Sequence, residues 1–124
     1  MPHKVLVIDD DIAITETLKV LLNAVGYEAH VAGDGESGIS KAKEIIPDII
    51  LLDLLLPNQD GFEVYREIRG IENLANVPII VLSSFAEKPV APDGTELDLP
   101  PDMFMAKPID PGILLQKMKI LLQD

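Results

Sequence analysis

The sequence predicts an α/β fold, a doubly wound parallel sheet of five strands with helices on both faces. Short β-rich runs alternate with stretches whose apolar residues recur at helical spacing. Two of the runs, Asp48–Asp53 and Val77–Leu82, are apolar on both faces, as parallel strands covered by helices must be. The 124 residues suit one domain and no linker or repeat divides them, so we expect a single domain over 1–124.

The first half of the chain contains two strand–helix units. Lys4–Ile8 predicts a strand that ends at three aspartates, and a helix closed by Gly26 follows it. Asp11 is suited to cap that helix. Tyr27–Ala32 predicts the second strand and Glu36–Ile46 the second helix. The apolar positions expected on the inner faces of the two helices are Ile14, Leu18, Leu21, Leu22 and Val25, then Ile39, Ala42 and Ile46.

The second half continues the alternation. The third strand is followed by turn residues at 57–61 and by a helix over Phe62–Arg69. After the fourth strand, a fifth is expected at Met103–Ala106. Asp110 is suited to cap the last helix, with a proline at its first position. The inward positions of that helix are Leu114, Met118 and Leu121.

One segment, residues 87–102, interrupts the alternation. Its prolines and an Asp-Gly turn leave room for one helical turn at most, around Thr95–Leu99. We therefore expect a Pro-rich loop here in place of a full helix.

The composition limits the kinds of partner. A net charge of −11 argues against binding to a phosphate backbone and suits a cation or a basic protein. No apolar run approaches the roughly 20 residues that span a bilayer, and there is no secretion signal and no cysteine. We therefore expect a cytoplasmic protein with no direct nucleic-acid contact and no membrane insertion.

Acidic and polar residues follow the predicted strands at the ends where a doubly wound sheet binds its ligands. Asp9 and Asp10 follow the first strand, Asp53 ends the third, Ser83 ends the fourth, and Lys107 follows the fifth. If these four strands are neighbours, the side chains converge on one rim. Clustered carboxylates repel one another, and Mg²⁺ with oxygen ligands relieves that repulsion.

Such a rim is suited to receive a phosphoryl group. Asp53 would be the nucleophile, Mg²⁺ and Lys107 would neutralise charge on the phosphoryl oxygens, and the Ser83 hydroxyl would donate to one of them. Each residue alone also has a common structural role, such as helix capping by an aspartate. The joint pattern at four strand ends favours an aspartyl phosphate.

Four stretches resemble the receiver domain of two-component response regulators: "VLVIDDD" (5–11), "DIILLDLLLPNQDG" (48–61), "VPIIVLSS" (77–84) and "FMAKPID" (104–110). The likeness spans essentially the whole chain, in the family's order and spacing. It implies a sheet ordered 2-1-3-4-5 and Mg²⁺-dependent phosphorylation by a histidine kinase or phosphotransfer protein. It also implies a downstream protein partner, which the sequence does not identify.

The resemblance assigns roles to individual residues. Asp53 matches the phosphoacceptor, and Asp9 and Asp10 match the acidic pair that holds the metal, Asp10 directly. Leu55 matches the position whose backbone carbonyl completes the metal coordination. Lys107 matches the family's lysine, and its bond to the following proline matches a peptide that is usually cis.

Ser83 and Phe104 match the two switch positions of the family, and here the chain departs from it. Phe104 lacks the hydroxyl that a tyrosine would offer, and the Pro-rich segment takes the place of the fourth helix. The positions that tune dephosphorylation hold Leu55 and Phe85, whose side chains cannot orient a water molecule. We therefore expect slow self-dephosphorylation, in a phosphoacceptor domain that is not itself an enzyme.

Two other functions compete with this one. Gly33–Gly38 fits the G-x-G-x-x-G pattern of dinucleotide-binding domains, although Asp34 and Glu36 would repel a pyrophosphate there. The chain could instead be an interaction module that works without phosphorylation. The sequence ends just after the last helix with no output domain, so we expect either a stand-alone receiver or a piece of a longer chain.

Overall fold

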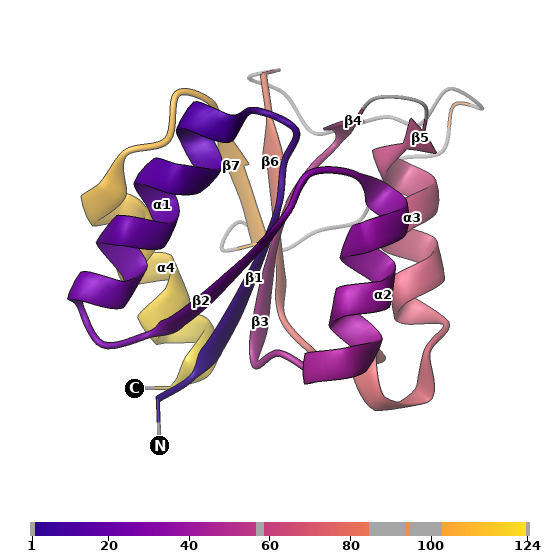
Figure 1. Cartoon of the computed structure of the whole chain (residues 1–124), viewed down its shortest axis with the longest axis horizontal. Helices are drawn as coiled ribbons and strands as arrows, with labels where there is room; N and C mark the ends of the chain where they lie inside the picture. The colour runs from indigo at the N-terminus through magenta and orange to yellow at the C-terminus, as the bar shows by residue number, and fades with distance from the viewer. Residues whose placement is uncertain (1, 57–58, 85–93, 95–102, 124) are drawn as a thin grey trace.

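Within the described residues, five parallel strands form one sheet with α-helices on both of its faces (Figure 1). The computed structural model of the chain describes residues 2–56, 59–84, 94 and 103–123. The sheet order is β2-β1-β3-β6-β7, which confirms the expected 2-1-3-4-5 order of the first to fifth strands. These strands are β1 (Lys4–Ile8), β2 (Glu28–Ala32), β3 (Ile49–Asp53), β6 (Ile79–Ser83) and β7 (Phe104–Ala106).

Each of the four α-helices among the described residues begins directly after an aspartate whose side chain accepts a backbone N–H of the first turn. The predicted caps at Asp11 and Asp110 are confirmed, and Asp34 and Asp60 cap the other two helices. The helices are α1 (Ile12–Ala24), α2 (Gly35–Ile45), α3 (Gly61–Arg69) and α4 (Pro111–Leu122).

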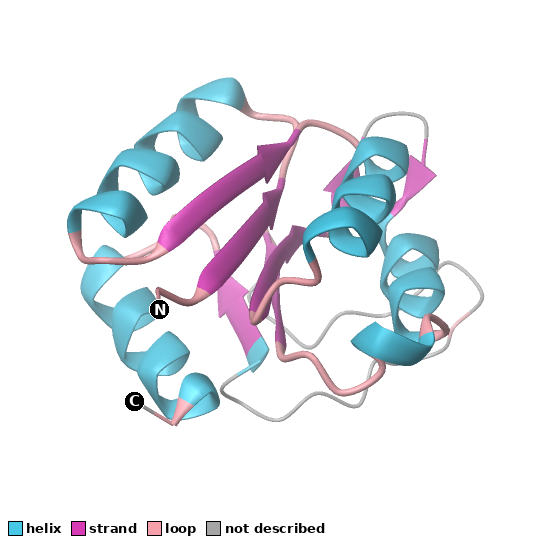
Figure 2. Ribbon diagram, turned by 60° about the horizontal axis from the view of Figure 1, so that its bottom comes forward, coloured by secondary structure: helices cyan, strands magenta, loops and turns pink. Residues whose placement is uncertain are grey.

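The core has two layers because the side chains of each strand alternate between the faces of the sheet. Leu6 and Ile8 pack toward α2 and α3, whereas Val5 and Val7 pack toward α1 and α4. Every residue of β3 and β6 is buried, as predicted for strands covered on both faces. Each buried leucine or isoleucine contributes roughly 1.5–3 kcal/mol of transfer free energy. Figure 2 shows the sheet between its two helical layers.

Two apolar residues do not lie where helical spacing placed them. Val25 follows the last residue of α1 and is 50% exposed. Ile46 follows α2 in a left-handed conformation, with φ 47, and is 46% exposed, while Ile45 packs against the core instead. In both cases the helix ends before the turn that would have carried the side chain inward.

Two small elements lie outside the predicted pattern. A two-stranded antiparallel ribbon joins β4 (Leu55–Leu56) to β5 (Gln59–Asp60), next to the start of α3 (Figure 1). A 3-10 turn, η1 (Glu72–Leu74), leads into β6. The expectations for the Pro-rich segment, for its helical turn at 95–99 and for Phe85 lie outside the described residues.

Candidate functional site

Parallel strands bring the predicted site residues to one edge of the sheet. Asp9 and Asp10 follow β1, Asp53 ends β3, and Ser83 ends β6 between β3 and β7. The Lys107 backbone N–H donates to the Ser83 carbonyl at 2.7 Å, so the segment after β7 stays in register with β6. The sequence therefore builds the rim through strand order alone, as predicted.

Two of the acidic side chains pair with Lys107, and a third lies beside them. Lys107 Nζ lies 2.9 Å from Asp9 Oδ2 and 3.2 Å from Asp53 Oδ2. Asp9, Asp10 and Asp53 each offer a carboxylate oxygen, and these three atoms lie within 4.8 Å of one another. The cluster thus holds three carboxylates, and the Lys107 ammonium pairs with two of them.

Backbone amides hold the second oxygen of each buried carboxylate. Asp9 Oδ1 accepts the Asp11 N–H, and Asp53 Oδ1 accepts the Leu55 N–H, both at 3.0 Å. Asp9 is 1% exposed and Asp53 3% exposed, whereas Asp10 is exposed. Because a buried carboxylate without partners is strongly destabilising, these amides and Lys107 are what allow the two aspartates to be buried.

The surroundings of Asp53 raise its pKa, chiefly through burial. Burial raises that pKa above the ordinary value and the Asp9 carboxylate raises it further, while the Leu55 N–H and Lys107 oppose the shift without cancelling it. For Lys107, burial lowers the pKa, but the hydrogen bond to Asp9 and the charges of Asp53 and Asp9 outweigh it, so the net shift is upward.

These residues fit a hard divalent cation. Carboxylate oxygens are the ligands that Mg²⁺ prefers, and a second positive charge would offset the carboxylates that Lys107 leaves uncompensated. Asp10 presents its exposed carboxylate at the mouth of the cluster. Leu55, expected to offer its carbonyl, begins β4 two residues beyond Asp53, with its side chain 54% exposed.

The two predicted switch residues lie on β6 and β7, the strands that end at Ser83 and directly before Lys107 at the rim. Ser83 is fully buried at the end of β6, and Phe104 is partly buried against the core layer beneath α2 and α3. Phe104 pairs with Val81 across β6 and β7. The peptide between Lys107 and Pro108 is cis, as the resemblance implied.

The glycine-rich stretch 33–38 has a structural explanation. Asp34 caps α2 by accepting the Ser37 N–H at 2.7 Å, a contact that lowers the pKa of Asp34, so its carboxylate occupies the helix start where a phosphate would bind. A Cβ on Gly38 would lie 2.7 Å from Ile8 Cδ1, so this glycine allows close packing. The preceding strand, β2, is at the sheet edge. The geometry disfavours a dinucleotide site.

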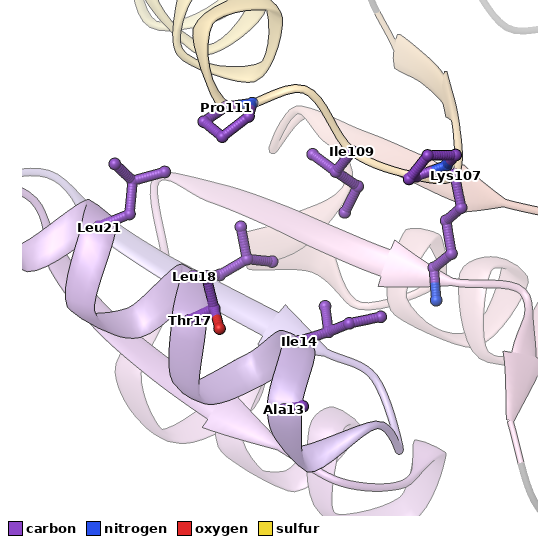
Figure 3. A pocket seen from close by; sticks show the side chains of 9 residues that line it. Ala13, Ile14, Thr17, Leu18, Leu21, Lys107, Ile109 and Pro111 are labelled. Atoms are coloured by element: carbon purple, nitrogen blue, oxygen red, sulfur yellow. The ribbon is translucent and has the colours of Figure 1, made fainter.

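An apolar groove of about 330 Å³ lies beside the acidic cluster, with Lys107 at one end (Figure 3). The side chains of α1 and of the segment after β7 face each other across it. Sequence reasoning missed this groove because its two walls are about 90 residues apart and helical spacing places no residue opposite another. The lining residues are Ala13, Ile14, Thr17, Leu18, Leu21, Lys107, Pro108, Ile109 and Pro111.

Comparison with known proteins decides the family. The sequence profile described as the response regulator receiver domain matches residues 5–119. The chain belongs to this family. Membership places the receiver domain among the proteins of two-component signal transduction, and the fold is the CheY-like, flavodoxin-like one.

The receiver domain is similar to parts of longer regulators. It is 34% identical over 120 residues to the DNA-binding dual master transcriptional regulator RpaA of Synechocystis, covering 97% of this chain and 49% of that protein. It is 32% identical over 123 residues to the DNA-binding response regulator MtrA of Mycobacterium tuberculosis, covering 99% and 52%. The chain thus spans about half the length of these relatives.

Solved structures share its fold. The receiver domain of a sensor histidine kinase from Pseudomonas aeruginosa superposes with a TM-score of 0.86 at 27% identity over 100% of both chains, and it has a magnesium ion coordinated in its active site cleft. The chemotaxis response regulator CheY4 of Vibrio cholerae gives a TM-score of 0.81 at 26% identity, covering 98% of this chain and 99% of that one. Among the described residues, no helix is long and apolar enough to cross a membrane.

Proposed function

We propose that this receiver domain is a phosphorylation-dependent signalling switch in which Asp53 accepts a phosphoryl group from a phosphohistidine. The donor would be a sensor histidine kinase or a phosphotransfer protein. The observation that carries the proposal is the cluster of Asp9, Asp10 and Asp53 at the carboxyl edge of the sheet, in which the Lys107 ammonium pairs with Asp9 and Asp53.

The transfer is a single displacement at phosphorus. A carboxylate oxygen of Asp53 forms the new P–O bond as the P–N bond to the donor imidazole breaks, and the imidazole leaves with the electron pair of that bond. Lys107 Nζ lies 3.2 Å from Asp53 Oδ2 and would neutralise charge on the phosphoryl oxygens. The phosphoryl group ends on the chain itself, so we class the chain as a phosphoacceptor and not as an enzyme.

Mg²⁺, held by Asp9, Asp10, Asp53 and the Leu55 carbonyl, would supply charge neutralisation for the phosphoryl group during transfer. The buried hydroxyl of Ser83 would donate to a phosphoryl oxygen, and Phe104 would respond as the neighbouring switch residue. The resulting change at β6 and β7 would alter the surface offered to a downstream protein.

The surroundings of the site bear on its partners and on the lifetime of the phosphate. A phosphodonor protein that reaches Asp53 has the apolar groove between α1 and the segment after β7 beside it. Leu55 presents an apolar side chain, 54% exposed, at a position suited to guide water, so we propose slow self-dephosphorylation. A cytoplasmic location fits a histidine-kinase partner. RpaA and MtrA are described as DNA-binding regulators. That this chain itself makes no direct contact with nucleic acid therefore stays a prediction.

Acetyl phosphate with Mg²⁺ tests the acceptor directly by intact mass spectrometry. The expected result is the gain of one phosphoryl group that disappears with Asp53→Asn or with a metal chelator. Asp48→Asn is a matched control, because Asp48 is an exposed aspartate whose Oδ2 accepts the Lys4 N–H at the opposite edge of the sheet. An unmodified mass in the wild type would overturn the proposal in favour of a phosphorylation-independent interaction module.

A further inference from the structure

Gly61, the first residue of α3, lies directly against the backbone of Leu54. A Cβ built on Gly61 would meet the Cα, carbonyl carbon and carbonyl oxygen of Leu54, with the carbonyl carbon at 2.7 Å. Real Cβ atoms essentially never approach another heavy atom closer than 3.0 Å. Because these are backbone atoms and not the flexible end of a side chain, any side chain at this position requires the chain to move.

Gly61 is needed for space and not for an unusual backbone angle. Among the described glycines, positive φ values occur at Gly26 and Gly94 and not at Gly61. The Gly61 N–H donates to the Leu54 carbonyl at 3.2 Å, which draws the start of α3 onto this peptide. The glycine is buried, so a side chain there could not turn outward into solvent.

The peptide that Gly61 touches also holds the phosphoacceptor. The Leu54 carbonyl and the Leu55 N–H belong to one planar peptide unit. That N–H donates to Asp53 Oδ1 at 3.0 Å. On its other side Leu54 is fixed, because its own N–H donates to the Leu82 carbonyl at 3.1 Å and its side chain is 5% exposed in the core. A side chain at position 61 that displaces the Leu54 carbonyl would therefore rotate or shift the Leu54–Leu55 peptide.

We propose that Gly61 is a positioning residue for Asp53. The absence of a side chain lets α3 seat the Leu54–Leu55 peptide, and this peptide sets the orientation of the Asp53 carboxylate. The expected effects on Mg²⁺ binding and on phosphorylation rest on the proposed function. The expected effect on the hydrogen bond between the Leu55 N–H and Asp53 does not.

The variant Gly61→Ala tests this inference by NMR. The Leu55 amide resonance reports its hydrogen bond to Asp53 without metal or phosphate, and a Mg²⁺ titration of the same sample gives the dissociation constant. We expect the Leu55 resonance to move in the metal-free protein and the dissociation constant to rise about ten- to a hundredfold, as when a group that orients a metal ligand is lost. Phosphorylation by acetyl phosphate should then require correspondingly more Mg²⁺.

Two other glycines provide matched controls. Gly33→Ala adds a Cβ with nothing within 4 Å, and Gly38→Ala adds one against the Ile8 side chain, so it strains the core without touching the peptide that Gly61 contacts. Both should keep the Leu55 resonance and the magnesium dissociation constant within about twofold of the wild type. An equal effect of Gly38→Ala and Gly61→Ala would overturn the proposal, because general destabilisation would then explain both.

Stability and the proposed function are separated within the same experiment. If Gly61→Ala is partly unfolded, all variants are measured in trimethylamine N-oxide, which favours the folded state. A Gly61→Ala protein that stays unfolded there, or one that keeps the wild-type Leu55 resonance, overturns the positioning role. A wild type that binds no Mg²⁺ and gains no phosphoryl group refutes the proposed function, while the Leu55 resonance still decides the role of Gly61.

Discussion

The Lys107 ammonium lies 3.2 Å from Asp53 Oδ2, and the same nitrogen also holds Asp9 at 2.9 Å. Both carboxylates are buried, and Asp10 stands at the mouth of the cluster. One positive charge thus offsets only part of a cluster of three negative charges. This imbalance suits the site to a cation, and we expect it to make the metal-free protein less stable than a variant with fewer negative charges.

Asp53→Asn should therefore stabilise the metal-free protein. The raised pKa of Asp53 means that its ionised form is disfavoured by folding. Removing that charge should therefore raise the free energy of unfolding in the absence of metal. Urea denaturation in chelator measures this difference. Saturating Mg²⁺ should stabilise the wild type more than Asp53→Asn, and a variant less stable than the wild type in chelator would contradict the imbalance.

The difference in stability between the wild type and Asp53→Asn should become smaller at low pH. Since the pKa of Asp53 is raised in the folded state, the folded protein binds more protons than the unfolded one between 3.8, the ordinary value, and the higher folded value. Stability from this group therefore falls as pH rises through that window. The gap between wild type and Asp53→Asn in chelator should be present at pH 7 and should shrink as pH falls toward 3.8. A gap that widens on acidification would show that the shift has the opposite sign.

The acidic rim could be predicted from sequence because it depends only on which residues end the parallel strands. Asp9, Asp53, Ser83 and Lys107 reach one edge whatever the details of the helices. The contact of Gly61 with Leu54 could not be predicted in this way, because it depends on how α3 docks on the loop after β3. The apolar groove could not be predicted either. Helical spacing identifies the apolar face of α1, but it does not show that the segment after β7 lies opposite that face.

Leu55→Asn should shorten the lifetime of the aspartyl phosphate. Leu55 is 54% exposed two residues beyond Asp53, and its side chain cannot hydrogen-bond a water molecule. A polar amide there could orient water toward phosphorus, and we expect hydrolysis to accelerate at least about tenfold. This factor is smaller than the acceleration that a positioned acid–base group usually provides. Intact mass measured over time after removal of acetyl phosphate gives both half-lives. Leu55→Met is the apolar control, and an unchanged half-life in Leu55→Asn would contradict the proposal.

Arg69 should be important for the stability of the loop between α3 and β6. Its Nη1 donates to the carbonyls of Leu74, Ala75 and Val77 at 3.2, 3.2 and 2.6 Å, and its guanidinium lies 5.3 Å from the centre of the Tyr65 ring. Arg69→Met should cost about 2 kcal/mol, because it leaves these carbonyls without a charged donor. Thermal denaturation with and without Mg²⁺ measures the loss.

Tyr65→Phe is the control for Arg69, since it keeps the ring beneath the guanidinium and removes only the hydroxyl, 3.5 Å from Nε. It should cost much less than Arg69→Met. Because the loop lies away from the acidic rim, the magnesium dissociation constant of folded Arg69→Met should match the wild type. Equal losses in the two variants would assign the stabilisation to the tyrosine hydroxyl instead of the carbonyl contacts.

Ile46→Asn should stabilise the protein. Ile46 follows the last residue of α2 with φ 47, a left-handed conformation that costs a β-branched residue about 1–2 kcal/mol and that asparagine adopts more readily. The side chain is 46% exposed, so replacing it sacrifices only part of its apolar burial, and we expect a net gain of about 0.5–1 kcal/mol. Urea denaturation with an unchanged slope would show the gain as a higher midpoint.

Ile120→Asn is the matched control, because Ile120 is 59% exposed within α4, where asparagine is a poorer helix former and should lower the midpoint. A lower midpoint for Ile46→Asn as well would show that the apolar contacts of Ile46 outweigh the strain of its backbone.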